Sequence, residues 1–403
     1  MRRGLIPALV LCAAPLAAQD APDPAMAGDG HPVELEVVHD WRAGPATRAL
    51  AAAFEAATQH VWIDGQEEEM VLVSRIIGGD PPEAALMPLG RRAEELARAG
   101  FLLDLTDLAA AQEWRRKMSD PALLDACTID GRVYCVPVTL RLEGWLMLSR
   151  PAFARAGLAM PESWEALVAD ADPLRAAGAA PLVIGTAGNL GEVLNAFTLA
   201  GGGRADWEAA HANGDSAAVG TPAFTQAFEE FALARDLSRG GNGGAGPAED
   251  DAIGGPAASV SADGSWAGAA GGDLKCLPGL GKAGPLVVTG DGFVFPDRRD
   301  PEIRKAQLTL ASFLLDPAVQ TDLSNHLGVL PARGNLDLPA LHPCTRRGLM
   351  ALATNGSVPA RDSVLPPGLG EAIDALLTEF WNDPAMTAAD LQSRYAETVA
   401  RGR

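Results

Sequence analysis

The chain has 403 residues, 48% of them hydrophobic, and its 52 acidic side chains outnumber 32 basic ones. This length suggests two domains or one large one, with enough apolar residues for sizeable cores. A net charge of −20 repels nucleic acid and anionic lipid, so neither is expected as a partner. Beyond the N-terminus, no apolar run reaches the roughly 18–20 residues that a membrane span needs.

The first residues, MRRGLIPALVLCAAPLAAQD, have the three parts of a secretory signal. Two arginines precede an apolar run, and small residues lead to Ala18. We expect residues 1–18 to be removed during export, which leaves 30 basic and 52 acidic side chains and a net charge of −22. Leu11 precedes Cys12 where a lipoprotein signal has a small residue, so no lipid anchor is expected. A buried first helix is the alternative.

The N-terminal part alternates strand and helix patterns. Val33, Leu35 and Val37 alternate with polar residues, as in a strand. A helix is predicted next in GPATRALAAAFEAATQ, beginning near Pro45, and another in RRAEELARAG, ending at Gly100. Strands alternating with helices predict an α/β fold with a mostly parallel sheet.

The C-terminal half repeats one helix-start signal, a capping side chain followed by proline. The signal occurs at Thr221-Pro222, Asp300-Pro301 and Asp316-Pro317. Three phenylalanines at helical spacing predict a face that packs in a core rather than a ligand site: Phe224, Phe228 and Phe231. The Gly/Pro-rich segment from Ser238 to Ala257 is expected to be a mobile surface loop or a linker.

No pattern typical of catalysis or metal binding occurs in the sequence. None of the six histidines lies four residues from another, and HExxH and CxxC are absent. The segment GLGKAG, Gly279 to Gly284, matches a dinucleotide-binding motif in form. It lacks the strand before and the helix after that such a motif needs, so we predict a glycine turn. We therefore expect no enzyme activity, no metal site and no cofactor.

Four cysteines remain after the signal segment, and an even count in an exported protein indicates two disulfides. Three pairings are open, and free thiols are a further alternative. Asp130-Gly131 is a strong hairpin-turn signal that would bring Cys127 and Cys135 face to face. The predicted pairs are therefore Cys127–Cys135 and, as the remainder, Cys276–Cys344.

Several stretches, in chain order, resemble the extracellular solute-binding proteins of bacterial ABC importers, most closely their carbohydrate-binding, glucose/mannose-like group. They include ELEVVHDWRAGPATRALAAAFEA, IDGRVYCVPVTLRLEGWLMLSR, SADGSWAG, GDGFVFP and HLGVLPAR. The resemblance implies a type II periplasmic-binding-protein fold: two α/β lobes with a ligand cleft between them. Because family-like segments return late in the chain, we predict lobe 1 from 19–142 plus 285–333, and lobe 2 from 143–284 plus 334–403.

The function implied by the resemblance is that of a periplasmic receptor, a monomer without a cofactor. It would bind a sugar or related polyol by hinge closure and deliver it to the membrane permease of an ABC importer. One alternative is a receptor-like protein with an altered ligand, acidic or not a sugar, that feeds a membrane sensor. An exported enzyme is a third reading, disfavoured because no nucleophile constellation is visible.

Six residues are predicted to bind the ligand: Trp41, Arg42, Arg141, Trp145, Trp266 and Asp291. By resemblance, Trp41 and Trp266 match the family's sugar-contacting tryptophans and Asp291 its hydroxyl-binding aspartate. In the family, the stretch after Val-Pro-Val lines the cleft, which implicates Arg141 and Trp145. A packed anchor is the alternative for Trp145.

The sequence also supports three of these positions directly, since Trp41 follows a strand and Trp266 and Asp291 lie among glycines. The alternative is that both tryptophans are core anchors and that Asp291 caps a turn. Other family polar positions are replaced, at Leu86, Pro88, Gly144 and Leu327.

Overall fold

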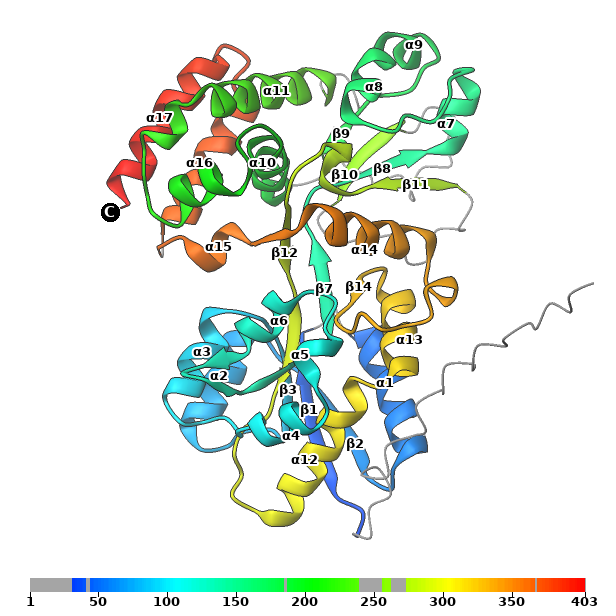
Figure 1. The fold of residues 1–403 in the computed structure, drawn as a ribbon, viewed down its shortest axis with the longest axis vertical. Helices are drawn as coiled ribbons and strands as arrows, with labels where there is room; N and C mark the ends of the chain where they lie inside the picture. The colour runs from blue at the N-terminus through cyan, green and yellow to red at the C-terminus, as the bar shows by residue number, and fades with distance from the viewer. Residues whose placement is uncertain are drawn as a thin grey trace, which may run out of the picture.

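The computed structural model describes residues 31–40, 44–184, 187–238, 256–261, 273–366 and 368–402. The predicted signal segment, most of the predicted loop and three predicted site residues, Trp41, Arg42 and Trp266, lie outside these ranges. Figure 1 shows two lobes, one above the other, with strands and α14 between them. We call the lower one lobe 1 and the upper one lobe 2.

Lobe 1 is built on a five-stranded sheet in the order β2-β1-β3-β13-β6. Its strands are β1 (Glu34–His39), β2 (Val61–Gln66), β3 (Ala84–Pro88), β6 (Cys135–Pro137) and β13 (Asp291–Val294). β1 pairs in parallel with β2 and β3, whereas β13 is antiparallel to both β3 and β6. The expectation of a mostly parallel sheet is confirmed, because only β13 runs in the opposite direction to the other strands of this sheet. β13 has that direction because the chain returns there from lobe 2.

Helices cover this sheet and close one continuous core. They are α1 (Gly44–Ala57), α2 (Glu69–Gly78), α3 (Arg91–Arg98), α4 (Thr106–Ala111), α5 (Trp114–Lys117), α6 (Pro121–Ala126), α12 (Pro301–Leu314) and α13 (Pro317–Leu327). Buried side chains of this core come from residues 35–138 and again from 293–323. The lobe therefore takes chain from both halves of the sequence.

Lobe 2 has its own sheet, in the order β11-β8-β10-β9. Its strands are β8 (Trp145–Ser149), β9 (Val183–Ile184), β10 (Ala258–Ser261) and β11 (Leu274–Leu277). Its helices are α7 (Arg150–Arg155), α8 (Trp164–Ala169), α9 (Ala171–Ala176), α10 (Ala187–His211), α11 (Pro222–Ser238), α16 (Leu369–Asn382) and α17 (Ala388–Arg401). The predicted phenylalanine stripe of α11 is confirmed, since all three rings are fully buried in this core.

A third sheet, in the order β14-β7-β12-β15, joins the lobes. Its strands are β7 (Thr139–Leu142), β12 (Leu286–Thr289), β14 (Leu330–Pro331) and β15 (Ser357–Pro359). It packs beside α14 (Pro343–Asn355) in a small core of its own, and α15 (Arg361–Val364) follows. We call the two strands that run from one lobe into the other, β7 and β12, the crossover strands.

Most local signals in the sequence act as predicted. The side chains of Asp300 and Asp316 each accept backbone N–H groups at the start of α12 and α13. Asp130 and Gly131 both have positive φ and turn the hairpin between β4 (Thr128–Ile129) and β5 (Arg132–Val133). Thr221 differs: its Oγ1 has no hydrogen-bond partner among the described residues, and only its carbonyl oxygen accepts the first helical bond.

Both predicted disulfides are confirmed. Cys127 and Cys135 have Cα atoms 5.1 Å apart across the hairpin, and Cys276 and Cys344 have Cα atoms 5.5 Å apart. The second bond ties β11 of lobe 2 to α14. The glycine turn predicted at GLGKAG is also confirmed. This segment begins in the 3₁₀ turn η4 (Pro278–Gly281) and not at the start of an α-helix, as a dinucleotide-binding motif would. Within the described ranges no helix combines the length and apolar character that crossing a bilayer requires.

Candidate functional site

The two crossover strands run side by side between the lobes. Val138 connects β6 to β7, and Gly290 connects β12 to β13, so each segment leaves one sheet and enters the next. β7 pairs antiparallel with β12, and β6 pairs antiparallel with β13. A Cβ atom at Gly290 would collide with the carbonyl oxygen of Thr139, so only glycine permits this close approach.

Asp291 lies at the centre of a polar cluster on these segments. Its Oδ1 accepts from Arg141 Nη2 at 3.0 Å, and its Oδ2 accepts from Thr139 Oγ1 at 3.1 Å. The Asp291 backbone N–H in turn donates to Thr139 Oγ1 at 2.9 Å. The Arg141 and Asp291 side chains are 25% and 21% exposed, so both are held in place yet reach solvent. We call these three residues the crossover cluster.

The cluster combines donors and an acceptor in a fixed arrangement. Hydrogen bonds in which one partner is charged are about twice as strong as neutral ones. A ligand hydroxyl that donates to the carboxylate of Asp291 and accepts from the guanidinium of Arg141 would use both charges at once. The pair is also neutral as a whole, so it offers no net charge to an ionic ligand.

The carboxyl end of β1 lies at the same edge of the lobe 1 sheet as Asp291, because β1 is parallel to β3 and β3 ends opposite Asp291. His39, 2% exposed, closes that strand, and its ring nitrogens lie 2.5 Å from the carbonyl oxygen of Asp40 and 3.2 Å from a carboxylate oxygen of Asp64. These contacts tie the end of β1 to β2. Trp41 and Arg42 follow directly in the chain but lie outside the described residues, so their predicted contact with ligand stays a prediction.

Lobe 2 contributes two carboxylates that the sequence prediction did not include. Glu143 accepts from Asn195 Nδ2 at 3.3 Å, and Glu192, on α10, accepts from the backbone N–H of Gly144 at 3.2 Å. Both line a small pocket beside β12. A signal for Glu143 existed: it follows Arg141 by two residues, and alternate residues along an extended segment point to the same side. Glu192 had no such signal.

Lys282 lines the same pocket but does not present a free charge there. Its ammonium donates to Glu165 and to Glu230, each at 2.7 Å. Burial by itself lowers the pKa of Lys282, but the hydrogen bonds to the two carboxylates outweigh it and the pKa is raised. Lys282 is therefore charged, and both of these carboxylate partners belong to lobe 2.

Trp145 is placed differently from the other described candidates. Its indole is 1% exposed and belongs to the core between the lobes, where it packs against α14 at Gly348. This burial favours the packed anchor over a ligand contact. Arg141 and Asp291, far apart in the sequence, are in contact, while Trp266 lies outside the described residues. No group of three metal-ligating side chains occurs in the described part of the chain.

Comparisons of the whole sequence with known proteins agree with this architecture. A family model described as bacterial extracellular solute-binding protein matches residues 40–296. A protein of Rhizobium meliloti named probable sugar-binding periplasmic protein is 25% identical over 377 residues, which cover 86% of this chain and 89% of that protein. A protein of Mesorhizobium japonicum with the same name is 23% identical over 395 residues, covering 91% and 93%.

Solved structures with the same fold cover nearly the whole chain. A chitin oligosaccharide binding protein superposes with a TM-score of 0.69 at 19% identity, over 93% of this chain and 99% of that one. At this identity the likeness shows the fold alone, which is the two-lobe fold expected from the sequence.

Proposed function

Because the chain belongs to the family of bacterial extracellular solute-binding proteins, we propose that it is the periplasmic receptor of an ABC importer and binds a sugar or related polyol between its lobes. Relatives of comparable length are named sugar-binding periplasmic proteins. The family and these relatives are binding proteins rather than enzymes. The receptor closes on its ligand by bending at the crossover strands and presents the closed form to a membrane permease.

The crossover cluster is the observation that carries this proposal. It lies where the chain passes between two separately packed cores, so a ligand bound there touches the segments about which the lobes rotate. Closure then changes the surroundings of Asp291 and Arg141 directly. A group on a rigid part of either lobe, remote from the crossover strands, would not couple binding to closure in this way.

The energy required for such a receptor is modest. A micromolar dissociation constant corresponds to about 8 kcal/mol, and a hydrogen bond to a charged group contributes about 1.5–3 kcal/mol. Two such bonds at the crossover cluster, with the apolar face of a sugar ring against Trp41 or Trp266, account for most of that figure. These contacts are the site we propose, together with Arg42 at its rim.

A neutral ligand fits the crossover cluster better than an acidic one. An acidic ligand, the second candidate considered from the sequence, would place its carboxylate on Arg141 and displace Asp291 from it. The displaced aspartate would then face the ligand's charge at short range, which is unfavourable. The pair therefore favours a sugar or polyol over a sugar acid.

A thermal-shift screen tests the proposal. The panel contains neutral mono- and disaccharides, polyols and sugar acids, each added to the mature protein. A ligand at 100 times its dissociation constant adds about 2.7 kcal/mol to the free energy of unfolding, enough to raise the Tm by several degrees. We expect neutral members to raise the Tm. A shift with sugar acids alone would support the acidic alternative, and no shift with any member would contradict sugar binding.

A further inference from the structure

Arg91 of lobe 1 contacts lobe 2 away from the crossover strands. Its Nη2 donates to the carbonyl oxygen of Leu365 at 2.9 Å, and the two residues are 274 positions apart in the sequence. Arg91 is the first residue of α3, and Leu365 directly follows α15. Figure 1 shows α15 on the underside of the upper lobe, facing the lower one. The hydrogen bond thus spans the two lobes.

The acceptor is held rigidly by the core of lobe 2. The Leu365 N–H donates to the carbonyl oxygen of Arg361 at 2.9 Å, and the Leu365 side chain is 2% exposed. Arg361 is itself fixed, because its guanidinium donates to Asp374 of α16 at 2.5 Å and lies against α10 at Gly191. The Leu365 carbonyl therefore moves with lobe 2 as a whole.

The donor belongs to lobe 1 and is exposed to solvent. α3 packs through Ala93, Leu96 and Ala97 into the core of that lobe, so the Cα of Arg91 moves with lobe 1. The Arg91 side chain itself is exposed. A hydrogen bond between an exposed guanidinium and a carbonyl of another rigid body forms and breaks with the distance between the two bodies.

We infer that the Arg91–Leu365 hydrogen bond is a latch that sets how far the ligand-free receptor is closed. The inference rests on the proposed hinge closure, because a latch acts only if the lobes move. When the lobes separate, the bond breaks, so it favours the conformation described here over more open ones. An exposed hydrogen bond of this kind changes such a population ratio about 2- to 10-fold.

The test measures the distance between the lobes without any ligand. Spin labels are attached to the mature chain at Asp80→Cys in lobe 1 and Asp172→Cys in lobe 2, positions whose side chains are 86% and 93% exposed. The four described native cysteines are in disulfides and do not compete for the label. Double electron–electron resonance then gives the distribution of interlobe distances. We expect Arg91→Ala to lower the ratio of the population at the wild-type distance to that at longer distances about 2- to 10-fold.

Arg92→Ala is the matched control. Arg92 is the next residue, carries the same charge, and pairs with Glu69 and Glu95, both within lobe 1. The Arg92→Ala variant should have the same distribution of interlobe distances as the wild type. A distribution for Arg91→Ala that equals the wild type, or an equal change in both variants, overturns the latch.

A second arm separates failure of the latch from failure of the proposed function. The same labelled wild type is measured with each member of the sugar and polyol panel. If a ligand narrows the distribution while Arg91→Ala alone does not change it, the hinge exists and the latch is wrong. If neither changes the distribution, both the latch and the proposed hinge closure are wrong.

Discussion

Arg361 and Arg141 each hold an aspartate, in two different regions of the molecule. The Arg361–Asp374 pair lies within lobe 2, where the Arg361 guanidinium is almost buried, at 7% exposed, although Asp374 is 39% exposed. The Arg141–Asp291 pair lies on the crossover segments, with both side chains partly open to solvent. A charge deep in a core is costly without its partner, because little water replaces the lost interaction. A half-exposed charge can exchange its partner for water or for a ligand hydroxyl.

The difference separates a structural pair from a binding pair. Arg361 belongs to a buried network in which Tyr395 donates to His211 Nε2 at 2.8 Å, while His211 Nδ1 donates to the Trp207 carbonyl oxygen at 2.9 Å. Burial raises the pKa of Tyr395 to about 12, so its hydroxyl remains a donor. Among the described residues, the Arg141–Asp291 pair of the crossover cluster stays partly exposed to solvent. The same residue types therefore stabilise lobe 2 in one place and are available to a ligand in the other.

The largest expected effect is on the lobe 2 pair. Arg361→Met removes the hydrogen bonds that a nearly buried guanidinium makes to Asp374 and Tyr395, so we expect the free energy of unfolding to fall by about 2–4 kcal/mol. Urea unfolding followed by circular dichroism measures the loss. A loss below about 1 kcal/mol would mean that the pair is no more important than a surface ion pair.

The next effect is the pH dependence of lobe 2. Burial lowers the pKa of His211 to about 4 from its ordinary 6.5. Between these values the unfolded chain binds a proton that the folded chain does not, so stability falls as the pH falls from 6.5 to 4. The shift corresponds to about 3 kcal/mol.

Urea unfolding at several pH values in this window, compared with His211→Gln, isolates that contribution. Glutamine keeps an acceptor for Tyr395 but does not titrate, so the variant should lose less stability on acidification than the wild type. His326→Gln, at an exposed position, is the control and should retain the wild-type slope. Parallel slopes in wild type and His211→Gln would contradict the assignment.

A smaller effect is expected at the crossover cluster, and it falls on binding. Asp291→Asn keeps the size of the side chain but removes its charge, so affinity for the ligand found in the thermal-shift screen should weaken by about 1.5–3 kcal/mol. The free energy of unfolding without ligand should change by only about 1 kcal/mol or less, since the pair is partly exposed. Calorimetric titration and urea unfolding measure the two quantities.

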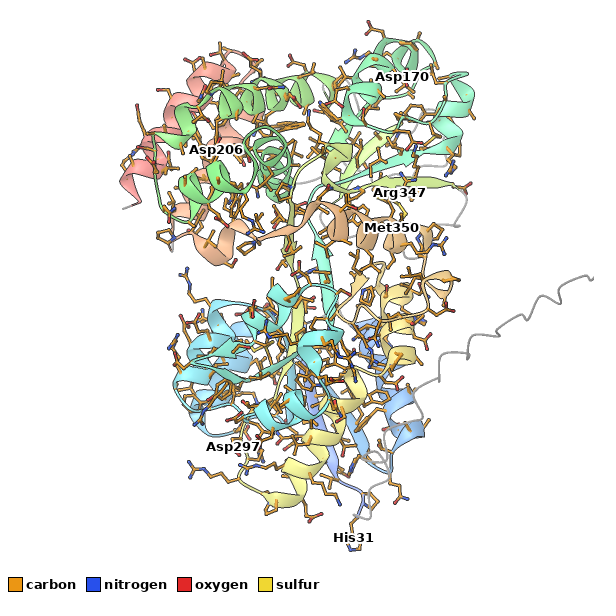
Figure 2. The ribbon with its side chains drawn as sticks, viewed as in Figure 1. His31, Asp170, Asp206, Asp297, Arg347 and Met350 are labelled. Carbon is orange, nitrogen blue, oxygen red and sulfur yellow. A yellow bond between two sulfur atoms is a disulfide. The ribbon has the colours of Figure 1, made fainter. Side chains whose placement is uncertain are left out.

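Asp297→Asn is the matched control for that experiment. Asp297 also pairs with an arginine, Arg304, at 2.9 Å. Figure 2 places it at the far end of lobe 1, away from lobe 2, whereas Arg347 and Met350 mark α14 at the level between the lobes. Its replacement should leave affinity unchanged. If Asp291→Asn loses stability but retains wild-type affinity, the crossover pair is structural like the pair in lobe 2.

The smallest effect is expected for an exposed pair in lobe 2. Arg394 of α17 donates to Glu379 of α16 with both Nη atoms, at 2.7 and 2.6 Å, and the two side chains are 43% and 51% exposed. Arg394→Met should cost no more than about 1 kcal/mol of the free energy of unfolding, because solvent screens the pair. Comparison of Arg394→Met with Arg361→Met tests whether burial of the arginine, rather than the presence of an ion pair, determines how much unfolding free energy is lost.

The sequence by itself determined the features that depend on neighbours along the chain. Asp300 and Asp316 cap their helices because a carboxylate followed by proline satisfies the first backbone N–H groups locally. The turn at Asp130-Gly131 pairs the cysteines on either side of it, and the other pair then follows. Arg141 and Asp291 were each predicted as ligand-binding residues through resemblance to a family, but the ion pair between them was not predicted.

Only the tertiary structure decided the features that join distant segments. Trp145 is an anchor because α14, about 200 residues later, presents Gly348 to its indole. The direction of β13 depends on its return from lobe 2, and the Arg91–Leu365 and Arg361–Asp374 contacts depend on how the helices of each lobe pack. Side-chain spacing specifies which face of an element is apolar, but not which other element covers it, because that choice is made by the packing of the whole lobe.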